Sequence, residues 1–167
     1  SRYQFKGNDR DWSRNNLHAI TRGTDFRFIP DSLFSNVLAL SGESETYVSI
    51  PGEAVSGEES LTICGWINLL SAQPGQMFFD FGKNSNSHFF AAPAGTKEKP
   101  GLQAAFVAGS KIYTTSSDAV PLKKWSHLAV VLDIPAKTLS TYLNGALVAE
   151  VKDATLDLSQ LFDTDSE

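Results

Sequence analysis

The chain has 167 residues, a length typical of one globular domain. Its formal charge is −5, but five of its acidic residues follow Lys152, so residues 1–152 carry 14 charges of each sign. A body without an excess of cations is not expected to bind nucleic acid, and no apolar run reaches the length of about 18 residues that predicts membrane insertion. The single cysteine, Cys64, excludes an internal disulfide and a cysteine zinc cluster.

Alternating polar and apolar residues divide the chain into short predicted strands, at the spacing typical of an all-β sandwich. They are Tyr3–Phe5 and Phe26–Ile29, which are weaker, then Val37–Ser41, Thr46–Ile50, Ser60–Leu69, Gln76–Phe81, His88–Ala92, Leu102–Val107, Lys111–Thr115, Ser126–Asp133, Leu139–Asn144 and Ala146–Val151. Asn144 and Gly145 predict a two-residue hairpin, because both positions of such a turn need a positive φ. No amphipathic helix is expected. The predicted fold is all-β, with two packed antiparallel sheets.

The strand at 60–69 has two distinct faces. Leu61, Ile63, Gly65 and Ile67 share one face, and Thr62, Cys64, Trp66 and Asn68 share the other. The large aromatic Trp66 predicts that the second face lies under a covering loop or lines a concave surface. The apolar residues around Cys64 favour a buried, inert thiol.

Six segments in order carry a family resemblance. They are ALSG at 39–42, YVSIP at 47–51, LTICGWI at 61–67, DFG at 80–82, WSHLAVVLD at 125–133 and LSTYLNG at 139–145. Together they resemble a laminin-G-like domain of the concanavalin A-like lectin/glucanase superfamily, over roughly residues 3–151. The resemblance implies a jelly-roll β-sandwich of two curved antiparallel sheets. Such domains are commonly non-catalytic modules of secreted bacterial glycan-degrading enzymes, and they often hold a structural calcium ion.

The end of the chain departs from the family pattern, because no closing strands are recognised after Leu161. We therefore expect one laminin-G-like sandwich over residues 1–162, with closing C-terminal strands missing or supplied elsewhere in the parent chain. Leu156, Leu158, Leu161 and Phe162 predict that the segment after the last hairpin still packs. Residues 163–167 are expected to form an acidic exposed tail or loop.

Catalysis is not predicted for this chain. The superfamily's glucanases use a Glu-x-Asp-x-x-Glu strand to place two carboxyl groups on one face, and no such strand occurs. Acidic pairs such as Glu43 with Glu45 lie in turns, where solvated side chains are the rule. A Gly-x-Ser-x-Gly nucleophile motif is also absent.

Calcium is the metal that the sequence favours most. Residues 6–16 gather several oxygen donors in one turn, and Asn8, Asp9 and Asp11 are the candidate ligands because calcium prefers oxygen. The family resemblance points to the same loop. The alternative is a cluster of Asx turns, in which these side chains bond the local backbone.

Carbohydrate binding requires aromatic faces for sugar rings together with amides and carboxylates for hydroxyl groups. The candidate residues are Tyr113, His88, Asn84, Asn86 and Trp12. The alternative is that each aromatic residue belongs to the core or covers it.

The sequence therefore predicts a non-catalytic accessory module of a bacterial glycoside hydrolase, located in the periplasm, at the cell surface or outside the cell. It would bind a glycan or brace the catalytic domain of the parent chain. Two alternatives stay open: a purely structural β-sandwich without glycan affinity, and a diverged glucanase-like hydrolase.

Overall fold

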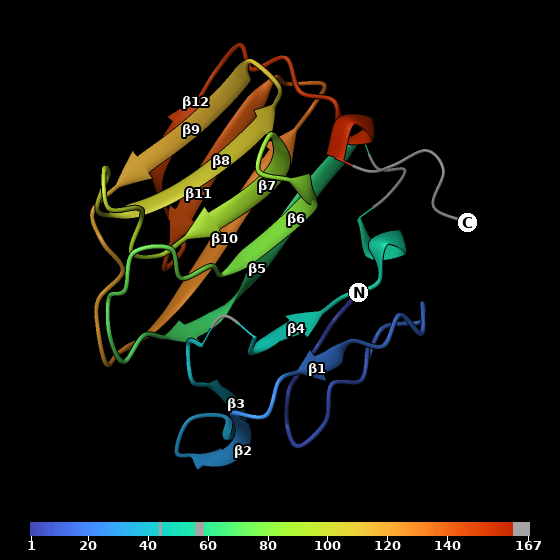
Figure 1. The fold of residues 1–167 in the computed structure, drawn as a ribbon, viewed down its shortest axis with the longest axis vertical. Helices are drawn as coiled ribbons and strands as arrows, with labels where there is room; N and C mark the ends of the chain where they lie inside the picture. The colour runs from blue at the N-terminus through green and yellow to red at the C-terminus, as the bar shows by residue number, and fades with distance from the viewer. Residues whose placement is uncertain (44, 56–58, 162–167) are drawn as a thin grey trace. The chain divides into compact units, whose positions relative to one another are not determined.

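A computed structural model describes residues 1–43, 45–55 and 59–161 (Figure 1). The chain forms two compact units, which divide after residue 56. Within the described ranges, no helix is long and apolar enough to cross a membrane.

The second unit is built from two four-stranded antiparallel sheets. One has the order β12-β11-β10-β5 and the other the order β6-β7-β8-β9. The strands of the first sheet are β5 (Ser60–Asn68), β10 (Trp125–Asp133), β11 (Thr138–Leu143) and β12 (Ala146–Val151). Those of the second are β6 (Phe79–Asn84), β7 (Ser87–Ala92), β8 (Leu102–Ala108) and β9 (Lys111–Ser117). The two sheets form the layers of a sandwich (Figure 1).

The main core lies between these sheets. Side chains from both sheets form one buried cluster, which includes Phe89, Phe106, Val130, Leu132 and Leu139, all with no exposed surface. Alternation along each strand produces this arrangement, because every second side chain of a strand points to the same face. Burial in β10 alternates in this way through all nine residues.

Within the part of the chain that the structure describes, a buried polar pair joins the two sheets inside this core. The hydroxyl groups of Thr115 in β9 and Thr141 in β11 lie 2.7 Å apart, and both residues are almost fully buried. The Thr115 hydroxyl also donates to the Ala104 carbonyl oxygen. A buried hydroxyl without a partner is costly, so this pair favours one alignment of the sheets.

The chain after β12 completes the core. Ala154, Leu156, Leu158 and Leu161 are buried in the main cluster, the last two within the 3₁₀ helix η2 (Leu158–Leu161). The Ala154 amide donates to the Lys137 carbonyl oxygen, and the Ser87 hydroxyl donates to the Gln160 carbonyl oxygen. The prediction that this segment packs is confirmed for the described leucines, while Phe162 and the tail at 163–167 lie outside the described residues.

The first unit contains two small antiparallel pairs. Strand β1 (Ile20–Arg22) pairs with β4 (Tyr47–Ser49), and β2 (Phe26–Asp31) forms a hairpin with β3 (Ser35–Leu40). A short 3₁₀ helix, η1 (Gly52–Ala54), follows β4. The loop before β1 is tied by one isolated antiparallel bridge between Tyr3 and Asp11.

The predicted all-β class with two antiparallel sheets is confirmed, and most predicted strands occur within a few residues of their expected bounds. The Asn144-Gly145 hairpin is also confirmed, with φ of 52° and 82° at the two positions. Strand β1 was not predicted. A single sandwich over 1–162 stays a prediction, since all eight sandwich strands described above belong to the second unit.

The prediction of a buried Cys64 is wrong, because this thiol is exposed. The alternation of β5 explains the error: Cys64 shares the outward face with Thr62 and with Trp66, whose surface is 52% exposed. The indole of Trp66 makes an edge contact with His127 on the neighbouring strand, at 5.3 Å between ring centres.

Two leucines on adjacent strands test this account of the core. Leu139→Ala should lower the free energy of unfolding by about 2–5 kcal/mol, because it opens a cavity at a fully buried position. Leu147→Ala is the matched control: this side chain is 51% exposed, so its loss should cost less than about 1 kcal/mol. Urea unfolding would measure both, and equal effects would contradict the assignment of the core.

Candidate functional site

An open hollow lies at the hairpin that joins β6 and β7. Its volume is about 360 Å³, and it is lined by Asp80, Gly82, Lys83, Asn84, Ser85 and His88. Every lining position except Gly82 has a polar or charged side chain. Such a lining suits a ligand that offers hydroxyl groups rather than an apolar ligand.

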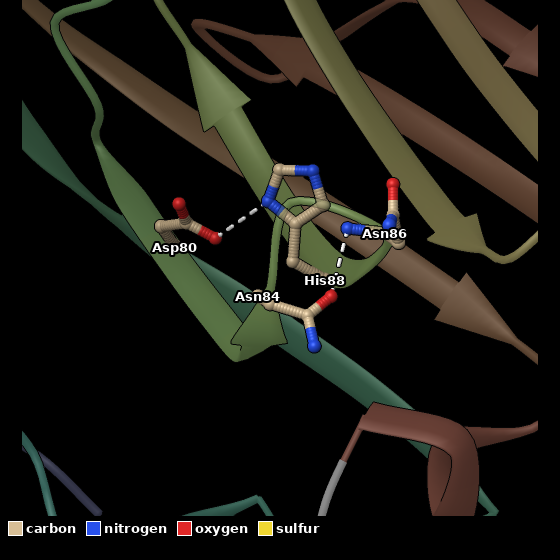
Figure 2. Close-up of polar contacts among 4 residues, drawn as sticks. All are labelled: Asp80, Asn84, Asn86 and His88. Atoms are coloured by element: carbon tan, nitrogen blue, oxygen red, sulfur yellow. Dashed lines mark hydrogen bonds and ion pairs between the residues drawn. The ribbon is translucent and has the colours of Figure 1, made fainter.

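Two of the lining residues, Asp80 and His88, contact each other. Asp80 Oδ1 lies 3.0 Å from His88 Nδ1 (Figure 2). The imidazole is mostly buried, with 17% of its side chain exposed, whereas the carboxylate is 44% exposed. The contact therefore fixes one carboxylate oxygen while much of the group still faces solvent.

The backbone at Gly82 allows this contact to form. Gly82 pairs with His88 and has φ of 156°, and the ladder shifts register between Gly82 and Asn84. A Cβ at Gly82 would lie 2.3 Å from the Ser87 carbonyl oxygen and 2.5 Å from the His88 Cα. Only glycine lets the two strands approach this closely beside the imidazole.

The turn beyond this pair holds two amides. Asn84 Oδ1 accepts a hydrogen bond from the Asn86 backbone amide at 2.9 Å, and both side chains are exposed (Figure 2). The Asn86 carbonyl oxygen in turn accepts from the Gly109 amide, so the β8–β9 turn supports the loop. Three predicted sugar-site residues, Asn84, Asn86 and His88, are thus brought together.

His88 also lies against an aromatic ring on the outward face of the sheet. Its ring centre is 4.8 Å from that of Phe90, at an interplanar angle of 32°. The neighbouring Phe89 points inward and has no exposed surface. This agrees with the alternation expected for β7, in which only one of the two phenylalanines can face outward.

The structure places the other two predicted sugar-site residues elsewhere. Tyr113 lies opposite Phe106 in the β8–β9 ladder and packs against the main core cluster. Trp12 belongs to the first unit and is 56% exposed. Tyr113 faces inward because it shares the face of Thr115, two residues later in β9.

Two lining residues were missed by sequence reasoning. Asp80 was noticed only within the family-like DFG segment, and Lys83 was not singled out. The pairing of Asp80 with Phe90 in the β6–β7 ladder puts Asp80 on the same face as His88. The polar turn lies between two phenylalanine-rich strands, which predicts a hairpin. Pairing these two strands across the turn would have placed Asp80 on the face of His88.

The loop predicted to hold calcium has its oxygen atoms engaged by the chain itself. Asp11 Oδ1 accepts from the Arg2 and Ser13 amides at 2.8 Å each, and Oδ2 accepts from the Ser13 hydroxyl and the Leu17 amide. Asp9 Oδ2 accepts from the Thr21 amide, and Asn8 Oδ1 from the Arg10 amide.

Each Asp11 oxygen already accepts two hydrogen bonds, so a calcium ion could bind Asp11 only if some of these bonds were broken. Among the described residues, no three His, Cys, Asp or Glu side chains form a group that could hold a metal. Calcium stays a prediction, and the observed hydrogen bonds are those of the alternative, an Asx-turn cluster.

The second unit is thus an antiparallel β-sandwich with a polar hollow at one hairpin. A laminin G family model, described as the concanavalin A-like lectin/glucanases superfamily, matches residues 41–164. The chain belongs to this family, as its sequence motifs predicted. A search of curated proteins finds no significant match.

One solved structure supports the fold. Domain 4 of AbnA, a GH43 extracellular arabinanase from Geobacillus stearothermophilus, in complex with arabinotriose, has a TM-score of 0.73 at 18% identity, covering 90% of this chain and 73% of that one. A Bacteroides ovatus ATCC 8483 protein assigned to carbohydrate binding has a TM-score of 0.46 at 16% identity, covering 90% of this chain and 35% of that one. At 18% identity the first likeness shows the fold alone, and the TM-score of the second is too low to support the fold.

The hydrogen bonds of Asp11 lead to a prediction about pH. Burial alone would raise the pKa of Asp11, but the bonds from the Arg2 amide, the Ser13 hydroxyl and amide and the Leu17 amide outweigh it and hold this pKa well below its usual value. The resulting stabilisation is complete above the unfolded-state pKa of about 4, and is lost as the pH falls below it.

Asp11→Asn should therefore destabilise the first unit at pH 5, and the difference from the wild type should shrink as the pH falls to 3. Hydrogen exchange of amides in residues 2–18 would report on this unit. Asp25→Asn, at an exposed aspartate of the same unit, is the control and should change little. A difference that stays constant over this pH range would contradict the role given to the Asp11 carboxylate.

Proposed function

We propose that this chain is a non-catalytic carbohydrate-binding module that holds a neutral oligosaccharide in the β6–β7 hollow. The observation that carries the proposal is the Asp80–His88 contact, which presents a fixed, half-exposed carboxylate in a hollow that the exposed Asn84 amide also lines. Carboxylate oxygens accept hydrogen bonds from sugar hydroxyls, and the Asn84 and Asn86 amides both donate and accept. A surface fixed before binding loses little conformational entropy when a ligand arrives.

The lining of the hollow favours binding over hydrolysis. Among the described residues that line it, Asp80 is the only carboxylate. Glycosidases of the common type use two carboxyl groups, about 5–5.5 Å or about 6.5–9.5 Å apart. A hydrolase activity of this chain would need a second carboxylate that this lining does not supply.

The proposed biological role is an accessory one. The module would attach to a bacterial glycoside hydrolase of the periplasm, cell surface or exterior, and would keep the catalytic domain close to its polysaccharide. Support comes from the arabinanase domain, which has a similar fold and whose structure is a complex with arabinotriose. Tethering raises the effective concentration of the catalytic domain at the substrate, so weak binding by the module suffices.

Two variants test the hollow directly. His88→Ala removes the group that fixes the carboxylate, and Asp80→Asn removes the charge while keeping the shape. Each should weaken binding of a neutral oligosaccharide about tenfold or more, as expected when a charged hydrogen-bonding group is lost. Calorimetric titration with arabinotriose and a panel of neutral gluco-, xylo- and manno-oligosaccharides would measure the affinities.

Asp118→Asn is the matched control, because this aspartate is exposed in the same unit but does not line the hollow. It should bind as the wild type does. If no oligosaccharide binds, the result contradicts the proposal and favours the alternative of a purely structural β-sandwich without glycan affinity. If the three variants lose affinity equally, or if the wild type hydrolyses an oligosaccharide, the proposed site and role are wrong.

A further inference from the structure

The first 22 residues differ in charge from the rest of the chain. They contain five basic residues, Arg2, Lys6, Arg10, Arg14 and Arg22, against two acidic ones, while the remainder is acidic overall. Both acids, Asp9 and Asp11, bond to backbone amides and hydroxyl groups rather than to guanidinium groups. This segment also lies before residue 41, where the family match begins.

The bridge between Tyr3 and Asp11 decides which side chains share a face. It is antiparallel, and the Trp12 amide donates to the Arg2 carbonyl oxygen at 2.7 Å. Arg2 therefore lies opposite Trp12. Residues directly opposite each other in an antiparallel pair project to the same face, about 5 Å apart at Cβ.

The opposite face of this pair is anchored inside the unit. Asp11 is 6% exposed, and the Tyr3 hydroxyl donates to the Leu17 carbonyl oxygen at 2.6 Å. By alternation, Arg2 and Trp12 point outward, and both are exposed. Arg10 is two residues before Trp12 and is exposed as well, so it belongs to the same outward side.

This outward face is held in place before any ligand arrives. The four hydrogen bonds that Asp11 accepts connect Arg2, Ser13 and Leu17 around Trp12. The Trp12 indole on this fixed loop is 56% exposed. Exposed tryptophan and arginine are the side chains most often found to dominate binding energy at interfaces.

We propose that Arg2, Arg10 and Trp12 form a second binding surface, which takes an acidic sugar such as a uronic acid unit of a polysaccharide. The indole face would cover the C–H face of the sugar ring, while the guanidinium groups would hold its carboxylate through charge-assisted hydrogen bonds. This surface does not depend on the proposed function of the β6–β7 hollow, since it lies wholly in the first unit.

A nucleic acid is another anion whose rings could stack on the indole, and it fits this surface less well. Binding of a strand requires several cations along a track and, commonly, several aromatic platforms in succession. Here one exposed tryptophan stands among arginines on a single short loop, and the rest of the chain is acidic. A surface with one tryptophan and a few arginines has the size to bind one charged sugar unit.

The full chain can be tested with a trigalacturonate and with its methyl-esterified form, which keeps the rings but removes the negative charges. The acidic form should bind at least about tenfold more tightly, and added salt should weaken it. Trp12→Ala should weaken binding of both forms about tenfold. The double variant Arg2→Gln with Arg10→Gln should remove the preference for the acidic form.

Two controls come from the same unit. Tyr47→Ala removes an aromatic ring that is 51% exposed in β4, and Arg27→Gln removes an exposed arginine in β2. Both should bind trigalacturonate as the wild type does. Hydrogen exchange in residues 2–18 should be unchanged in Trp12→Ala, which would show that the loop is still folded.

Three results would overturn the proposal: no binding of trigalacturonate, an equal loss of affinity in the control variants, or equally tight binding of a short oligodeoxythymidylate. The last result would indicate a general polyanion site. His88→Ala separates this proposal from the previous one, because it should weaken neutral oligosaccharides and leave trigalacturonate binding unchanged.

Discussion

The contact between the inward faces of the two four-stranded sheets determines the rest of the second unit. Phe89 and Phe106 from one sheet meet Val130, Leu132 and Leu139 from the other, all without exposed surface. Because side chains alternate strictly along a strand, burying one set fixes the direction of every other residue. His88 and Asp80 face outward because Phe89 and Phe79 face inward. The candidate site is thus a consequence of the core, and a one-residue slip of β7 would bury the imidazole.

The alternation explains how much could be predicted from the sequence. The β10 strand shows it clearly, and the strand, its burial and the Asn144-Gly145 hairpin were all predictable from local pattern and turn chemistry. Family motifs added the sandwich. What local pattern does not contain is the register between strands, and this is why Asp80 was not recognised as the partner of His88. Tyr113, another candidate for the sugar site, packs against the core cluster because it shares the face of the buried Thr115 in β9.

The structure of the loops was harder to predict from the sequence, because it depends on hydrogen-bond and strand partners that are distant along the chain. The oxygen-rich segment around Asp11 has the composition of a cation site and equally that of a turn cluster. Its hydrogen bonds reach from Arg2 to Leu17, a span that no local motif encodes. Strand β1 was missed in the same way, since its three residues form a strand only by pairing with β4. Cys64 was misjudged because apolar neighbours along the chain lie on the opposite face of the strand.

Asp11 and Asp80 show how one residue type takes two different roles. Asp11 is 6% exposed and accepts two hydrogen bonds at each oxygen, so its charge is used to hold a loop together and has little capacity left for a ligand. Asp80 is 44% exposed at its side chain and is oriented by a single imidazole. A carboxylate can organise the chain or face a ligand, and the number of donors around it decides which. By this criterion Asp11 supports a surface formed by its neighbours, whereas Asp80 is itself the group that can meet a hydroxyl.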